Sequence, residues 1–241
     1  MNKALSILAI AAIAGGVQGQ WDETGDGGGD AGVTLFGTAA QTTSGVGALT
    51  SITGTIDNSV VDDLDGFFIT VTDADAFFAS TDPNDGGSFI GNTGFEDDSR
   101  LWLFDTSGNL IMANDDNDDS SGTDSLESRI GNLGVQYDGP AFNSPGSVVD
   151  GATYILVIGE FSNSVVDAAG EEIADFSADF GALHGLNPLF DASTAQNENP
   201  GSFTASVDYN IVLGGATFAI PAPASAALLG LGGLAAARRR R

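Results

Sequence analysis

The densest group of chemically active side chains lies in residues 114–119, which read NDDNDD. Four carboxylates within five positions repel one another, so an ordered loop here is costly unless a positive charge binds to it. A hard cation such as calcium is held by oxygen ligands of this kind. The residues that a calcium site here would use are Asp115, Asp116, Asn117, Asp118, Asp119 and Asp124.

The loop does not match the helix-loop-helix calcium signature. Its first three ligand positions are filled by Asp115, Asn117 and Asp119. However, Ser120 stands where the signature needs glycine, and Leu126 stands where it needs the final glutamate, with Glu127 one position late. Two interpretations stay open. One is a different calcium site that adds Asp124 or Glu127, and the favoured one is a solvated acidic loop.

No set of side chains in the sequence forms a complete catalytic motif. Residues 105–108 (DTSG) differ from the aspartic-protease motif Asp-Thr-Gly by a displaced glycine, and no second motif completes a pair of carboxylates. His184 is the only histidine, cysteine is absent, and no serine lies in a nucleophile-elbow motif. One histidine alone also falls short of a zinc site. The sequence therefore predicts a protein that is not an enzyme.

The acidic loop is positioned by two short apolar runs that precede it. Residues 101–104 (LWLF) are consecutive large apolar residues, a pattern typical of a strand buried on both faces. Residues 105–109 (DTSGN) favour a hairpin turn, because aspartate bonds to nearby backbone and the glycine or asparagine accepts a positive φ. Residues 110–112 return as a second strand, and a third strand is expected to begin near Ile130.

Further strands are expected where apolar residues alternate or run together. They cover residues 33–39, 49–56, 67–72, 154–159 and 203–212, with turns or loops at 62–66 and 81–87 and a short helical turn at 73–79. Trp102 and most of the 15 phenylalanines are expected in the core, and a sugar-stacking platform is the less favoured alternative. The predicted fold is all-β, a single jelly-roll-like β-sandwich over residues 33–218.

Basic residues are scarce in the predicted sandwich. Of seven Lys and Arg, one lies near the start and four end the chain, so Arg100 and Arg129 face all 33 acids, a balance of 2 − 33 = −31. This charge excludes nucleic acid as a partner, because phosphate binding needs positive charge. We expect each arginine to form a structural ion pair with a carboxylate beside the central hairpin.

The first 32 residues predict a leader and a linker. Residues 1–19 combine Lys3, an apolar run and small residues before the cleavage position, a pattern typical of a signal peptide with an N-terminal signal helix. Cleavage is expected after Gly19. Residues 20–32 (QWDETGDGGGDAG) are rich in glycine and acid, so a flexible segment is predicted there.

The last 23 residues, 219–241, predict a C-terminal transmembrane helix with a basic end. The run from Pro223 to Ala237 is about 22 Å long as a helix, so spanning a core of ~30 Å needs preceding residues or arginine snorkelling. Positive charge fixes such an end in the cytoplasm. The residues expected to take part in sorting or processing are Pro221, Ala222, Pro223, Arg238, Arg239, Arg240 and Arg241.

Two family resemblances extend these predictions. Residues 67–73, 101–105, 107–116, 128–130 and 150–158 resemble recurrent strands and turns of the bacterial pre-peptidase C-terminal (PPC-like) β-sandwich domain, in the version found in planctomycete-type exported proteins. That resemblance covers residues 50–176 and implies a non-catalytic accessory or binding module. The tail resembles the PEP-CTERM sorting signal handled by exosortase, with Ala222 in place of the usual glutamate.

The expected function is that of a non-enzymatic cell-envelope or extracellular-matrix protein. Its expected partners are the export machinery, signal peptidase, an exosortase-type processing enzyme and the membrane, through the C-terminal helix. The protein is expected outside the inner membrane, anchored facing outward and later at the cell surface or released. The alternative is a calcium-dependent carbohydrate-binding or adhesive module, with polysaccharide as its ligand and calcium as its cofactor.

Overall fold

The computed structural model describes residues 19–31, 40–57, 64–91, 98–108, 110–115, 117–118, 124–131, 141–143, 148–160, 165 and 206–221. Within these ranges the regular structure is β-strand, apart from one 3-10 turn, η1 (Pro83–Asp85). The all-β prediction is therefore confirmed. No helix in the described part of the chain is long and apolar enough to cross a bilayer.

The first sheet is mostly antiparallel and is centred on β4 and β15. Its strand order is β1 (Gly19–Asp22), β4 (Leu49–Asp57), β15 (Ser206–Gly214), β6 (Phe78–Ser80) and β12 (Arg129–Gly131), and β7 (Ser88–Gly91) also pairs with β15. Only β1 pairs in parallel, with Trp21 opposite Ile52. Alternate residues of β15 are buried, as the predicted alternation in 203–212 requires.

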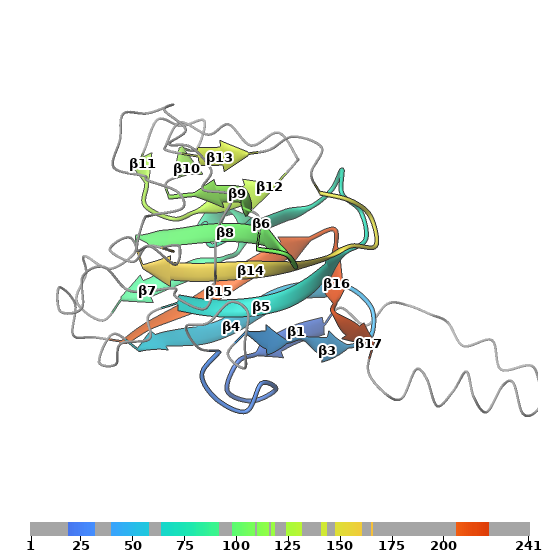
Figure 1. Cartoon of the computed structure of the whole chain (residues 1–241). Helices are drawn as coiled ribbons and strands as arrows, with labels where there is room; N and C mark the ends of the chain where they lie inside the picture. Colours follow the sequence, from blue (N-terminus) through green and yellow to red (C-terminus); the bar gives the residue numbers. More distant parts are fainter. Residues whose placement is uncertain are drawn as a thin grey trace, which may run out of the picture.

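The second sheet is centred on β14. Its order is β13 (Ala141–Asn143), β9 (Leu110–Asn114), β8 (Ser99–Asp105), β14 (Thr153–Glu160), β5 (Leu64–Val71) and β16 (Ala216–Phe218), and β2 (Gln41–Thr42) also pairs with β5. Two short pairs lie outside both sheets: β10 (Asn117–Asp118) with β11 (Asp124–Ser125), and β17 (Ile220–Pro221) with β3 (Ser44–Gly45). Residues 101–130, called the central stretch from here on, start in β8 of this sheet and end in β12 of the first sheet (Figure 1).

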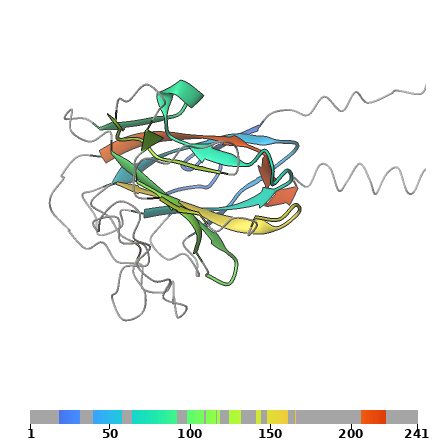
Figure 2. The same ribbon diagram turned by 90° about the horizontal axis from the view of Figure 1, so that it is seen from above.

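The two sheets pack face to face around one main core. Ile52 and Ile211 of the first sheet join Ile69, Leu103 and Leu156 of the second in a single buried cluster. Figure 2 shows the layers from above, with the orange strand β15 in one and the yellow strand β14 in the other. Burial of this apolar surface is the main favourable term in folding.

Strands β8 and β14 are buried on both faces, as their apolar runs predict. Leu101 and Leu103 point into the main core, whereas Trp102 and Phe104 belong to a second cluster on the outer face of the sheet. Trp102 is therefore a core residue, and its buried ring is not available for a sugar to stack on. The hairpin turn is also confirmed: Gly108 has φ of 90°, and the Ser107 N–H donates to Asp105 Oδ1.

Three local predictions are corrected by the structure. Residues 64–66 were expected in a turn because of their acids and glycine, but they form the buried start of β5. The helical turn at 73–79 is replaced by a tight turn from Asp73 to Ala76, although Phe77 is buried as expected. The flexible segment at 20–32 is wrong for the described residues 20–31, because Trp21 and Ala31 are buried and β1 joins the sheet.

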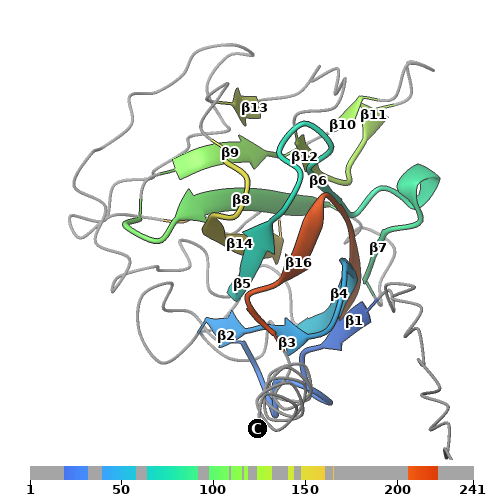
Figure 3. The same cartoon turned by 90° about the vertical axis from the view of Figure 1, so that its right-hand side faces the viewer.

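The strands nearest to the predicted leader and tail meet at one end of the sandwich. The Phe218 ring lies so close to Gly19 and Gly45 that a side chain at either glycine would collide with it. Figure 3 shows β1, β3 and β16 together at this end. The predicted strand at 33–39, His184, Phe203 and the tail after Pro221 lie outside the described residues.

Candidate functional site

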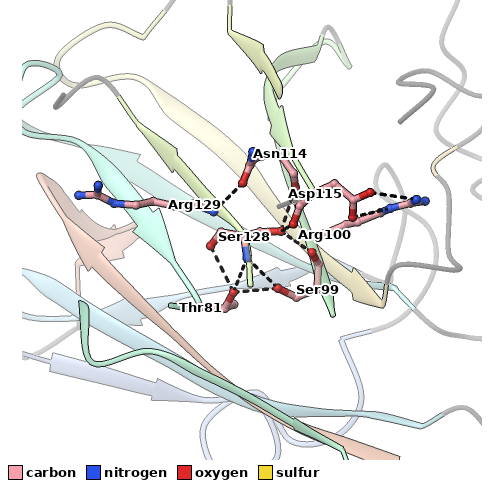
Figure 4. A network of polar contacts seen from close by, with 7 residues as sticks. All are labelled: Thr81, Ser99, Arg100, Asn114, Asp115, Ser128 and Arg129. Atoms are coloured by element: carbon pink, nitrogen blue, oxygen red, sulfur yellow. Dashed lines mark hydrogen bonds and ion pairs between the residues drawn. The ribbon is translucent and has the colours of Figure 1, made fainter. Parts of the chain in front are cut away.

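The central stretch is fastened to the rest of the sandwich by a buried network of hydroxyl groups around Ser128 (Figure 4). Ser128 precedes β12, Thr81 follows β6, and Ser99 starts β8, so the network joins both sheets. All three side chains are fully buried. Hydrogen bonding is therefore needed to offset the desolvation of these groups.

Each polar atom at Ser128 has a partner in this network. Its N–H donates to Thr81 Oγ1 at 2.9 Å and to Ser99 Oγ at 3.1 Å. Its hydroxyl reaches the backbone carbonyls of Ser99, Asn114 and Asp115. A hydroxyl has one proton, so it donates to one of these three carbonyls at a time. Ser128 thus ties the end of β9 to the start of β8.

Arg100 and Asp115 form a largely buried ion pair beside this network. Arg100 Nε lies 2.9 Å from Asp115 Oδ1, and Nη2 lies 3.2 Å from Oδ2, a two-pronged arrangement. The two side chains are each 12% exposed. Burial raises the pKa of Asp115, and the positive charge and hydrogen bond of Arg100 oppose that rise. The pair therefore holds a desolvated carboxylate in place.

Arg129 forms the second predicted ion pair, in a more exposed position. Its Nε lies 2.9 Å from Asp85 Oδ2, and its guanidinium sits 5.4 Å from the centre of the Phe78 ring. The Arg129 N–H also donates to Asn114 Oδ1. The expectation that each arginine has a carboxylate partner beside the central stretch is therefore confirmed.

The predicted calcium ligands are brought together only in part. Both carboxylate oxygens of Asp115 accept hydrogen bonds from Arg100, so Asp115 is engaged in an ion pair. Asn117 lies in β10, where Asp118 stands directly opposite Asp124 of β11. Asp116 and Asp119 lie outside the described residues. Calcium binding by this loop stays a prediction.

A different group of acids, which the sequence analysis did not single out, lies between the two sheets. Oxygen atoms of Glu23, Asp30 and Asp65 all lie within 4.8 Å of one another, and we call these residues the carboxylate cluster. Glu23 and Asp65 are each only 2% exposed, whereas Asp30 is exposed. Such crowding of acids favours the uptake of a positive charge.

The carboxylate cluster includes Glu23 because the N-terminal segment, residues 19–31, folds over it. Glu23 Oε1 accepts the Ala31 N–H at 2.6 Å, and Oε2 accepts the Thr55 N–H at 3.0 Å. Gly54 makes room for Glu23, because a side chain at position 54 would collide with Oε2. These bonds join both ends of the loop after β1 to strand β4.

Gln41 fixes the same loop from its other side. Its Oε1 accepts the indole N–H of Trp21 at 2.9 Å, and its Nε2 donates to the carbonyls of Glu23 and Gly29. One amide side chain thus holds three points of the N-terminal segment. This arrangement explains why a glycine-rich sequence is ordered here.

Tyr209 completes the carboxylate cluster from strand β15. Its hydroxyl donates to Glu23 Oε2 at a long 3.4 Å. Burial raises the pKa of Tyr209 well above its usual value, and the charges of Asp65 and Glu23 add to that rise. The tyrosine is 3% exposed and therefore acts as a neutral donor to the acids.

The sequence of the chain was compared with known protein families and with curated protein sequences. No model of a known protein family matches the chain, and no curated protein sequence matches it.

The hydroxyl network predicts a cost for Ser128→Ala. The substitution leaves buried carbonyls without their donor, which should lower the free energy of unfolding by about 1–3 kcal/mol. Urea denaturation of the full chain measures this. Ser107→Ala is the matched control, because Ser107 is exposed in the hairpin turn and its loss should change stability by less than about 0.5 kcal/mol. Equal midpoints for both variants would contradict the assignment.

The buried ion pair predicts a non-additive result. Arg100→Met leaves the Asp115 carboxylate without its partner and should cost about 3 kcal/mol at pH 7, whereas the double variant Arg100→Met with Asp115→Leu should recover most of that loss. At acidic pH, protonation of Asp115 should make the loss in free energy of unfolding of Arg100→Met smaller than at pH 7. Arg129→Gln, in the more exposed pair, should cost no more than about 1 kcal/mol. If the double variant loses as much free energy of unfolding in urea as the two single variants together, this role of the ion pair is refuted.

Proposed function

We propose that this chain is an exported, non-enzymatic protein of the cell envelope or extracellular matrix. In this proposal a signal peptide over residues 1–19 directs export, and a PEP-CTERM-like signal over residues 219–241 directs sorting by an exosortase-type enzyme. The domain between them is a jelly-roll-type sandwich related to PPC-like modules. It is held outside the inner membrane and then presented at the surface or released.

The observation that carries the proposal is the match between domain boundaries and predicted signals. Strand β1 begins at Gly19, the residue before the expected cleavage, and β17 (Ile220–Pro221) lies within the first residues of the predicted sorting signal, 219–241. The Phe218 ring of β16 lies against Gly19 of β1 and Gly45 of β3, and β3 pairs with the last strand, β17 (Figure 1). Cleavage after Gly19 would leave Trp21 and the rest of the N-terminal segment in the fold.

The burial and the contacts of these polar residues support a structural role for the domain. Ser128, Thr81 and Ser99 are fully buried, so a substrate has no access to their hydroxyl groups. Arg100 and Asp115 are engaged with each other. These groups bind the strands of the sandwich to one another, which suits a chain that has no cysteine for disulfides.

Intact-mass measurement of the protein from its own cells tests this proposal. The expected protein starts at Gln20 and is found in the membrane fraction or outside the cell. A variant lacking residues 222–241 should leave the membrane fraction, because it lacks the predicted membrane helix and its arginines. A full-length chain, soluble in the cytosol with both ends intact, would refute the proposal.

A calcium-dependent adhesive or carbohydrate-binding module is the second candidate. The observation that favours it is the register of β10 and β11, which sets Asp118 opposite Asp124. Like charges in directly opposite positions destabilise a strand pair, and a bound cation would relieve this.

The calcium candidate predicts a higher melting temperature in millimolar calcium and a return to the original value with chelator. Asp118→Asn should abolish that shift, because it removes one of the paired charges. Asp22→Asn, an exposed acid of β1, is the matched control and should retain the shift. A melting temperature that calcium leaves unchanged would remove this candidate.

A further inference from the structure

We propose that the N-terminal segment, residues 19–31, is held on the sandwich by a proton shared within the carboxylate cluster, so that it detaches as the solution becomes alkaline. This inference concerns a conformational switch and does not depend on the proposed function. It starts from the position of Glu23, which lies in the segment, opposite Asp65 of β5 in the second sheet. The cluster therefore spans the boundary between the segment and the domain.

The charged and titratable groups that face Glu23 from its own loop, from β5 and from β15 are Asp30, Asp65 and Tyr209. Strand β4 contributes Gly54 and the Thr55 N–H. The two basic residues among the described ones, Arg100 and Arg129, are paired with Asp115 and Asp85. Full ionisation would place three negative charges within 4.8 Å of one another.

The direction of the pH effect follows from burial. Desolvation raises the pKa of Glu23, and the charge of Asp30 adds to the rise, whereas the N–H groups of Thr55 and Ala31 oppose it. A carboxyl whose folded pKa exceeds its unfolded pKa contributes its stability fully below the unfolded pKa. That contribution is lost as the pH rises through the folded pKa. The N-terminal segment is therefore held most firmly in acid.

The contacts of the segment determine what detachment would release. Glu23 is the point at which the loop returns to β4, through the bonds from Ala31 and Thr55. The remaining attachments include the four-residue pairing of β1 with β4, the three hydrogen bonds of Gln41 and the burial of Trp21 and Ala31. Ionisation of the cluster thus acts on a small segment at the edge of the first sheet, and its opening would also withdraw Trp21 and Ala31 from the main core.

Hydrogen exchange on the full chain tests this switch. After correction for intrinsic exchange rates, protection of residues 19–31 should be lower at pH 8 than at pH 5, because the cluster loses its proton as the pH rises. Protection of β14 should stay constant, which shows that the domain itself remains folded. Equal protection of residues 19–31 at both pH values would overturn the proposal.

Asp65→Asn is the decisive variant, because the amide removes one charge and donates to Glu23. It should keep residues 19–31 protected at pH 8. Asp208→Asn is the matched control: Asp208 is an exposed acid that also contacts Thr55, and its variant should lose protection like the natural chain. If Asp65→Asn does not fold, Glu23→Gln should likewise remove the pH dependence.

Two outcomes would count against the shared proton. One is an unchanged pH dependence in Asp65→Asn or, where that variant does not fold, in Glu23→Gln. The other is recovery of protection at pH 8 by millimolar calcium, reversed by chelator, which would show that a divalent cation neutralises the cluster. If protection of residues 19–31 is recovered only when the solution is acidified, the result supports the proposal.

Discussion

The shortage of positive charge is the constraint on which the rest of this structure depends. The sandwich buries several carboxylates, and the described part of the chain contains two basic residues, Arg100 and Arg129. Arg100 pairs with the largely buried Asp115, and Arg129 pairs with Asp85 closer to the surface. Elsewhere, backbone N–H groups must hold the acids, as those of Ala31 and Thr55 do for Glu23.

Buried hydroxyl groups play the complementary part, since they join strands without adding charge. The bonds around Ser128 connect the end of β9, the start of β8 and the residues before β12, which belong to different sheets. A hydroxyl donates and accepts, so it can serve a backbone N–H and a carbonyl at one point. This network lets the central stretch cross between layers without an unsatisfied backbone group at Ser128.

Short-range patterns predicted the central strands, whereas contacts between distant segments were not predictable from sequence. The apolar runs at 101–104 and 154–159 and the turn at Gly108 depend on neighbouring residues, and the structure agrees. The carboxylate cluster joins Glu23 to Asp65 through the packing of two sheets, which no local pattern encodes. Glycine content predicted flexibility at 20–32, but burial of Trp21 outweighs it.

Strand β1 also has a consequence for the behaviour of the protein at high concentration. It occupies the edge of the first sheet next to the nine-residue strand β4, and it is itself only four residues long with acidic Asp22 at its end. Long open edges invite pairing between molecules, and short, charged edges discourage it. The N-terminal segment therefore covers the long edge of β4 and discourages its pairing with another molecule.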